Sequence, residues 1–325
     1  MTADVTIVVV PRERFSRAIE SLNSIYRHTD YPFKLVYVDG NSPPAIGARI
    51  ADASRERGFT LLRRDRYLIP NEARNLGLAC VDTEFVVFLD NDVLVTPGWL
   101  ERLVACARDT SAWLVIPLYL EGRPEDRIVH MAGGTAVLSE EGGRRVFKNA
   151  HRFFGRPVDD VKEQLRREPT GSIEYHCLLA RRDVFGKVGL FDERIPSVWE
   201  HTDLALSVQE QGGRIYFEPE AIVSYDSAGA LKWYDLAYFA VRWSDEWGRM
   251  SIDRFREKWG LSPDDRDVKF MYQYSAIYRR HFLRRLLPIQ PRLFGRNLGT
   301  PAVSMMDQLL RLRFARPARI AALTH

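Results

Sequence analysis

The chain has 325 residues, 46% of them hydrophobic, which is enough for a substantial core in one large domain or two ordinary ones. Cys80, Cys106 and Cys177 are widely spaced, which excludes a disulfide scaffold and a zinc-type spacing, so we expect buried structural thiols in a reducing compartment. No apolar run approaches the roughly 18 to 20 residues that would span a bilayer, so we expect a soluble globular protein.

The net charge of +4 is unevenly distributed. Residues 279–325 contain ten arginines and one acid, Asp307, so this tail carries about +9 and the rest of the chain about −5. No nucleic-acid-binding module accompanies the tail, and its apolar residues are interleaved with Arg. We therefore expect no nucleic-acid partner, but a peripheral contact with a membrane surface. Because the N-terminus enters a strand pattern without a signal-type segment, we expect a cytoplasmic protein, at the inner face of the membrane if the tail binds there.

Strands and helices alternate along the first 105 residues. Apolar runs predict strands at Val5–Val10, Phe33–Val38, Phe59–Leu62 and Phe85–Leu89. Apolar residues at helical spacing predict helices at Arg14–His28, at Ala45–Arg57 and from Pro70. This alternation indicates β-α-β units, and the fourth run suits a strand buried on both faces of a parallel sheet.

Polar side chains follow two of these strands. Asp39 ends the second, and Asp90, Asn91 and Asp92 end the fourth. Open α/β sheets bind ligands at the carboxyl ends of their strands, and an Asp-x-Asp pair there can offer hard oxygen ligands to Mg²⁺ or Mn²⁺. The triplet alone is better explained as a polar turn before a helix near Trp99. For Asp39, a nucleotide contact and an ordinary turn residue are equally supported.

Arg74 lies on the helix that begins at Pro70, near the same predicted sheet edge. Its planar guanidinium suits a diphosphate, or the neighbouring carboxylates, better than the ammonium of a lysine would. The alternative is an arginine on a solvated helix face.

The second half of the chain is predicted to continue the sheet. We expect a strand at Trp113–Leu120, a hairpin within Val129–Val146, and a helix at Val158–Arg167 in a mobile or acceptor-facing loop. From Trp233 onward the pattern is helical. Its aromatic residues can form a sugar-stacking platform, although core packing is more common at this spacing.

Four motifs in order resemble the nucleotide-binding half of the family 2 glycosyltransferases: the strand Val5–Val10, Asp39-Gly40-Asn41-Ser42, residues 71–77 around Arg74, and residues 88–93 around Asp90 and Asp92. Residues 189–193 and 199–204 extend the resemblance to the acceptor side, and Tyr216–Tyr225 resembles the pair of strands that closes the family's sheet. It implies a GT-A-like (Rossmann-like) α/β fold, a mixed sheet flanked by helices, over residues 1–230. Residues 1–105 would be the nucleotide-binding half, 106–230 the acceptor-side half and 231–325 a helical, basic extension.

The resemblance implies inverting, hexosyltransferase-type transfer from a nucleoside diphosphate sugar, with a UDP-sugar as the leading choice. The acceptor would be a glycan, a lipid-linked molecule or a small molecule, and the cofactor Mn²⁺ or Mg²⁺. For nucleotide binding it points to Pro11, Asp39, Arg74, Asp90 and Asn91. Asp90 and Asp92 would hold the metal on the diphosphate.

The sequence departs from the family pattern at two places. At the helix start that supplies the general base, Trp199-Glu200-His201-Thr202-Asp203 has His201 where a second acid is common. We take Glu200 as the base, Asp203 as a helix cap or acceptor contact, and His201 as a lesser candidate. After the closing strands, Asp226 stands where many members have a metal-binding His. Asp226 is either a third metal ligand or replaced by water.

Two alternatives remain at this point. A nucleotidyltransferase also binds a nucleotide and a metal at a sheet edge, but residues 10–14 lack the glycines of its usual phosphate loop. A non-catalytic sugar-nucleotide-binding protein could use the same scaffold. The oligomeric state is open, with a homo-oligomer among the possibilities.

Overall fold

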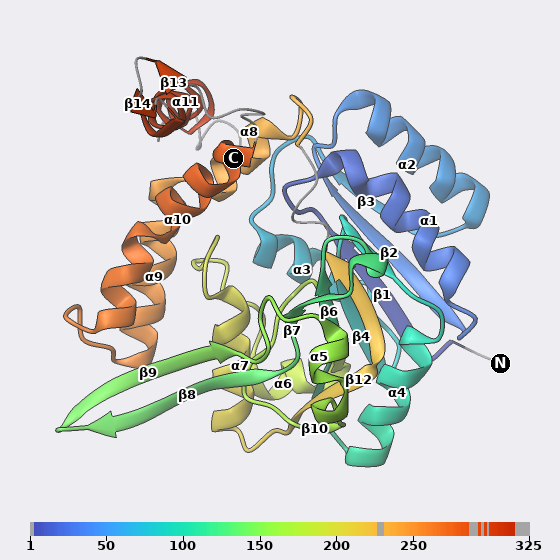
Figure 1. Cartoon of the computed structure of the whole chain (residues 1–325). Helices are drawn as coiled ribbons and strands as arrows, with labels where there is room; N and C mark the ends of the chain where they lie inside the picture. Colours follow the sequence, from blue (N-terminus) through green and yellow to red (C-terminus); the bar gives the residue numbers. More distant parts are fainter. Residues whose placement is uncertain (1–2, 226–230, 286–291, 294–295, 298, 316–325) are drawn as a thin grey trace.

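A computed structural model describes residues 3–225, 231–285, 292–293, 296–297 and 299–315 (Figure 1). In this part of the chain, ten strands form one mixed sheet. Its main path is β10 (Glu168–Pro169), β12 (Ile215–Tyr225), β6 (Leu114–Glu121), β11 (Cys177–Arg181), β4 (Phe85–Asp90), β1 (Val5–Val10), β2 (Phe33–Gly40) and β3 (Thr60–Arg64). Beside this path, β5 (Val93–Val95) pairs with β12, and β7 (Ile128–Met131) pairs with β6.

The pairing of β1 with β4 sets the position of the site. The two strands are parallel and in register from Val5 opposite Phe85 to Val10 opposite Asp90. Every residue of both strands is buried, as expected for strands covered on both faces. The segment that follows Val10 therefore begins beside Asp90.

The helices of the first third of the chain flank the sheet. They are η1 (Phe15–Arg17), α1 (Ala18–His28), α2 (Pro44–Arg57), α3 (Pro70–Leu78) and α4 (Trp99–Thr110). Figure 1 shows α1 and α2 side by side near β2 and β3. The strands and helices expected up to residue 110 are confirmed, except that the first helix begins with a 3₁₀ turn and that β5 was not expected.

The expected hairpin is confirmed as β8 (Gly134–Glu141) and β9 (Arg144–His151). Gly142 and Gly143 form its two-residue turn with φ of 57° and 73°, which suits glycine. The helix expected at Val158–Arg167 is shorter, with α5 (Val158–Val161) followed by η3 (Lys162–Gln164). Two further short helices are η2 (Pro124–Asp126) and η4 (Arg182–Val184), and the latter leads into α6 (Phe185–Val188).

The expected closing strand pair is instead one strand, β12, whose register with β6 shifts between Glu218 and Ile222. Pro219 lies in this stretch and has no amide hydrogen to donate, which explains an irregularity in place of a turn.

The later helices form a second hydrophobic core. They are α7 (Glu200–Glu210), α8 (Leu236–Arg242), α9 (Asp245–Trp259), α10 (Arg266–Arg285) and α11 (Gly299–Phe314), with a small β13 (Arg292–Leu293) and β14 (Arg296–Asn297) pair. This core joins Phe147 of the hairpin and Trp199 to residues from α8 to α11. The aromatic residues after Trp233 mostly pack in the interior, whereas Trp233 itself is 81% exposed.

Two further expectations concern thiols and membranes. Cys106 and Cys177 are buried, but Cys80 is exposed, so the expectation of three buried thiols was wrong for Cys80. None of the helices in the described ranges combines the length and apolar character needed to cross a bilayer.

Candidate active site

A cavity of about 220 Å³ lies between the sheet and the later helices. Segments distant in the sequence line it: the loop after β1, strand β7, the end of β9, the approach to β11, the start of α7, the end of β12, and helices α8 and α10. Many of the lining side chains carry titratable groups: Arg12, His130, His151, Glu174, His176, Glu200, His201, Tyr225 and Arg242.

Asp90 lies at the end of β4 and is held by three cationic or polar side chains. Its Oδ2 is 3.2 Å from Arg12 Nη1 and 3.1 Å from His176 Nδ1, and its Oδ1 is 3.6 Å from Arg74 Nη2. His176 reaches it because antiparallel pairing places Cys177 opposite Leu89. Although burial alone would raise it, Arg12 and His176 hold the pKa of Asp90 below its ordinary value.

Asp92 is equally buried but lacks such partners. Neither carboxylate oxygen has a hydrogen-bond partner within the described part of the chain. Burial, together with Glu13 and Asp90, raises its pKa well above the ordinary value. An unpartnered buried carboxylate is costly, and a hard divalent cation would compensate its charge. The residues of the Asp-x-Asp motif therefore fit Mn²⁺ or Mg²⁺. In the described part of the chain, the two carboxylates are not among the residues that line the cavity.

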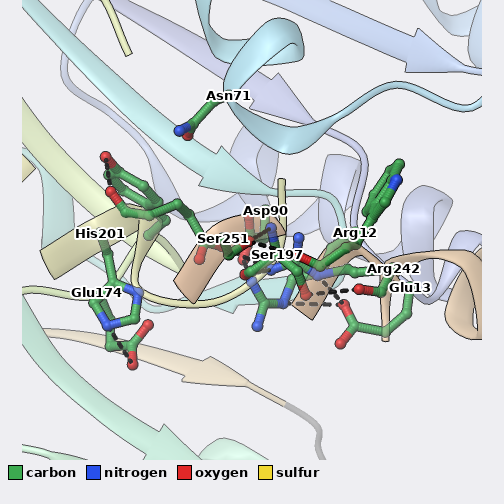
Figure 2. A network of polar contacts seen from close by, with 12 residues as sticks. Arg12, Glu13, Asn71, Asp90, Glu174, Ser197, His201, Arg242 and Ser251 are labelled. Carbon is green, nitrogen blue, oxygen red and sulfur yellow. Dashed lines mark hydrogen bonds and ion pairs between the residues drawn. The ribbon is translucent and has the colours of Figure 1, made fainter. Parts of the chain in front are cut away.

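A buried network connects the segment after β1 with α7 and α8 (Figure 2). Glu13 accepts a hydrogen bond from Trp243 Nε1 at 2.9 Å and is paired with Arg12 at 3.1 Å. Arg242 lies 3.6 Å from Glu13 and donates to Glu200 Oε1 at 2.8 Å. The carboxylate of Glu200 is thus occupied by a guanidinium.

His201 faces the cavity beside Glu174. Its Nε2 lies 3.7 Å from Glu174 Oε1, and Figure 2 shows this pair apart from the arginine network. Trp199, two residues earlier, has φ of 62°, a region that bulky residues seldom adopt and that is often found at functional sites. Tyr175 holds this turn by donating from its hydroxyl to the backbone oxygen of Glu200 at 3.1 Å. The geometry presents an imidazole with an adjacent carboxylate to the cavity.

Asp203 is not a helix cap. Its carboxylate accepts hydrogen bonds from Trp259 Nε1 at 2.8 Å and Lys258 Nζ at 2.7 Å, and α7 has no side-chain cap. The capping prediction was wrong because α9 packs against α7, a contact between segments far apart in the sequence. Asp203 also does not line the cavity.

Asp39 and Arg74 both have protein partners. Asp39 accepts a hydrogen bond from the backbone of Ser42 at 2.9 Å, as a turn residue does, and it also pairs with Arg63. Arg74 is 0% exposed, so the solvated-face alternative was wrong. Besides its contact with Asp90, the Arg74 guanidinium lies 3.7 Å from the centre of the Tyr175 ring.

Three predicted nucleotide or metal residues remain, and the structure describes two of them. Asn91 accepts a hydrogen bond from the backbone of Arg12 at 2.8 Å, so it fixes the segment after β1. Pro11 is buried and packs near Gly40. Asp226 lies outside the described residues.

Sequence reasoning missed His130, His151, Glu174 and His176. They lie on different elements, and no local motif unites them. One signal was present: of the seven histidines in the chain, four fall between residues 130 and 201, and all four line this cavity. His176 also stacks on Tyr225, with ring centroids 4.0 Å apart.

Residues 6–189 match the sequence model of the family described as Glycosyl transferase family 2. The chain is 28% identical over 235 residues to Pre-mycofactocin glycosyltransferase of Mycobacterium tuberculosis, a match that covers 70% of this chain and 44% of that protein. It is 26% identical over 245 residues to N-acetylglucosaminyl-diphospho-decaprenol L-rhamnosyltransferase of the same species, covering 69% of this chain and 75% of that protein. The chain thus spans less than half the length of the first relative.

Two solved structures resemble the whole fold. GalNAc-T7 with UDP, GalNAc and Mn²⁺ has a TM-score of 0.52 at 16% identity, over 90% of this chain and 59% of that chain. Mannosyltransferase PcManGT from Pyrobaculum calidifontis, in complex with GDP-Man and Mn²⁺, has a TM-score of 0.50 at 17% identity, over 99% and 86%. These likenesses confirm the expected GT-A-like mixed α/β sheet.

Proposed function

Because this chain belongs to glycosyl transferase family 2, we propose that it transfers a sugar from a nucleoside diphosphate sugar to an acceptor hydroxyl, with inversion at the anomeric carbon. The observation that carries the proposal is Asp92, a buried carboxylate without a hydrogen-bond partner in the described ranges, at the sheet edge where a diphosphate and its cation would meet. UDP-sugars are the first donors to test, and GDP-mannose the second.

Asp92 would hold a Mn²⁺ or Mg²⁺ ion, together with the Oδ1 atom of Asp90. When bound, such an ion stabilises the negative charge that develops on a departing diphosphate. Arg12 is the arginine suited to the diphosphate itself, because it lines the cavity and also contacts Asp90. Arg74 is fully buried and does not line the cavity, so its role is to help position Asp90.

We place the general base at His201 rather than at Glu200. The Glu200 carboxylate accepts a hydrogen bond from the buried Arg242, so this oxygen is already occupied by a guanidinium and is not free to meet an acceptor hydroxyl. His201 faces the cavity, and a neutral imidazole is a stronger base near neutral pH. With the Nε2 proton directed toward Glu174, Nδ1 can accept the acceptor proton, and Glu174 stabilises the resulting imidazolium.

In this reaction the acceptor oxygen forms a bond to the anomeric carbon while the bond from that carbon to the diphosphate oxygen breaks. The bonding electron pair leaves with the diphosphate, and the hydroxyl proton moves to His201. Attack on the face opposite the leaving group gives inversion.

The test compares His201→Gln with Glu200→Gln. His201→Gln keeps a hydrogen-bonding side chain of similar size but loses basicity, so single-turnover transfer should fall by about 10² to 10⁴ while donor affinity stays near normal. Glu200→Gln should lose less of the chemical step. Normal transfer by His201→Gln beside an inactive, folded Glu200→Gln would return the base to Glu200.

We propose that any membrane contact is peripheral and involves α11. On this helix Met305, Leu309 and Leu312 are exposed, with the basic residue Arg313 beside them. Apolar side chains flanked by arginine are typical of helices that lie on anionic membrane surfaces. The same face could also serve a second copy of the chain.

A further inference from the structure

A second set of metal-type ligands lies in the cavity, on the side of His201. His130 on β7, His151 at the end of β9 and Glu174 before β11 each offer one ligand atom, and these atoms lie within 4.8 Å of one another. Across the described ranges, no other group of three His, Cys, Asp or Glu side chains meets this spacing. The Asp-x-Asp carboxylates take no part in it.

One separation in this cluster is already close to that around a small ion. A tetrahedral ion with bonds of about 2.0 to 2.1 Å holds its ligand atoms about 3.3 to 3.4 Å apart. His151 Nε2 and Glu174 Oε1 are already 3.6 Å apart. The larger separations, up to 4.8 Å, would have to close by rotation of side chains, and all three residues are only partly buried.

The chemical state of the three side chains favours a metal ion. Burial and the neighbouring His176 lower the pKa of His130 to about 3, and burial lowers the pKa of His151. Despite burial, His201 and His176 lower the pKa of Glu174 far below its ordinary value. Neutral imidazole and ionised carboxylate are the ligand forms that bind metals, and these three side chains offer both types. In addition, Nδ1 of His130 is buried and has no hydrogen-bond partner within the described ranges.

We propose that His130, His151 and Glu174 bind a divalent transition metal, with Zn²⁺ the leading choice, at a site separate from Asp90 and Asp92. Imidazole nitrogens favour Zn²⁺ over Mg²⁺ and Mn²⁺, and two His with one Glu is a ligand set of catalytic zinc sites. Three protein ligands leave a coordination position open to the cavity for water or a hydroxyl oxygen. Oε1 of Glu174 lies near both His151 and His201, and its second oxygen would take over the contact with His201 when Oε1 binds the ion.

The experiment uses the full chain freed of metal with a chelator and titrated with Co²⁺ as a spectroscopic stand-in for Zn²⁺. We expect one equivalent to give the intense visible absorption of tetrahedral Co²⁺, which Zn²⁺ abolishes and Mg²⁺ does not. Asp92→Asn should bind Co²⁺ as the wild type does, so the result is independent of sugar transfer.

The site variants are His130→Ala and His151→Ala, and the control is His281→Ala, an exposed histidine on α10. Loss of a residue that only orients a metal ligand weakens metal binding by roughly 10- to 100-fold. Loss of a ligand itself should weaken Co²⁺ binding by at least this factor in each site variant, and the control should bind Co²⁺ as the wild type does. Circular dichroism shows whether each variant is folded. If His130→Ala unfolds, His151→Ala and competition by Zn²⁺ still decide the question. Absence of the tetrahedral spectrum, or an unchanged affinity in a folded His151→Ala, would overturn the proposal.

Discussion

The buried charges at the sheet edge are unequally satisfied. Asp90 has Arg12, Arg74 and His176 around it, whereas Asp92, two residues later, has no hydrogen-bond partner within the described residues. Removing water from a carboxylate without providing a partner destabilises the folded state. Such a cost persists in a native site when a ligand relieves it, which is why we assign Asp92 to a cation.

This difference predicts opposite stability effects for two similar substitutions. In metal-free protein at neutral pH, Asp92→Asn should raise the melting temperature, because it removes an unpartnered buried charge, while Asp90→Asn should lower it by leaving Arg12 and Arg74 without their carboxylate. Thermal unfolding with a chelator present measures both.

The stability gained by Asp92→Asn should depend on pH, because burial raises the pKa of Asp92. Its folded pKa lies above its unfolded pKa, so Asp92 lowers the stability most at pH values above the folded pKa and no longer does so below the unfolded pKa. The gain from Asp92→Asn should therefore shrink as the pH falls through the raised pKa and vanish below about 3.9. A gain that is independent of pH would contradict this account.

At the residue scale, the sequence could predict Asp90, Asp92 and Arg74 because each lies at or beside the carboxyl end of a strand, where position alone suggests a site. It could not predict His130, His151 or Glu174. Their proximity depends on how β7, β9 and the approach to β11 converge, and no spacing in the sequence encodes that convergence.

At the element scale, the close packing of α3 on the sheet positions Arg74. A Cβ atom on Gly77 would lie 2.2 Å from Cγ1 of Val8, a separation that cannot occur without movement of α3 or β1. The helix therefore approaches the sheet closely only with glycine at this position, and the approach places Arg74 beneath Tyr175 and next to Asp90.

Gly77→Ala should therefore destabilise the protein by about 1 to 3 kcal/mol, the usual effect of overpacking a close contact. Gly186→Ala on α6 is the matched control, since a Cβ there meets no atom within 4 Å. Chemical denaturation of both variants gives the two free energies of unfolding. Equal stability of the two would show that α3 can move away from β1 at no cost.

Element boundaries were predictable in the first half because apolar runs and helical spacing alternate cleanly. In the second half, the bulge of β12 and the early end of α5 depend on pairing with distant strands. The cavity wall formed by α8 and α10 was likewise not predictable, because the aromatic pattern fits a helical core without showing which surface that core covers.

At the scale of the whole molecule, part of the basic tail is structural. Arg279 is 0% exposed and pairs with Asp307 at 2.6 Å and with Asp245 at 2.9 Å, so it joins α10 to α11 and α9. The tail's positive charge is thus not wholly available to a membrane. We propose that a catalytic domain ends near residue 230 and that a helical extension follows it. Residues of this extension, on α8 and α10, complete the cavity.

Loss of Asp307, the buried one of the two acidic partners of Arg279, should be strongly destabilising. Asp307→Asn should lower the free energy of unfolding by about 3 to 5 kcal/mol, as expected when one member of a buried ion pair is removed. Asp264→Asn is the control, because its pair with Lys269 is exposed and screened by solvent, so this substitution should leave the free energy of unfolding nearly unchanged. A small effect of Asp307→Asn, measured by urea denaturation, would mean that α11 can be released from the body at little cost.

The most direct test of the account measures the release of a nucleoside diphosphate from UDP-sugars and from GDP-mannose. The reactions are run with and without Mn²⁺, and chromatography monitors the products. We predict that at least one donor gives the nucleoside diphosphate in a Mn²⁺-dependent reaction with the wild-type chain, and that folded Asp92→Asn reduces this release to background. Release of a nucleoside monophosphate would indicate nucleotidyl transfer. No release from any donor, or equal release by Asp92→Asn, would contradict sugar transfer at this site.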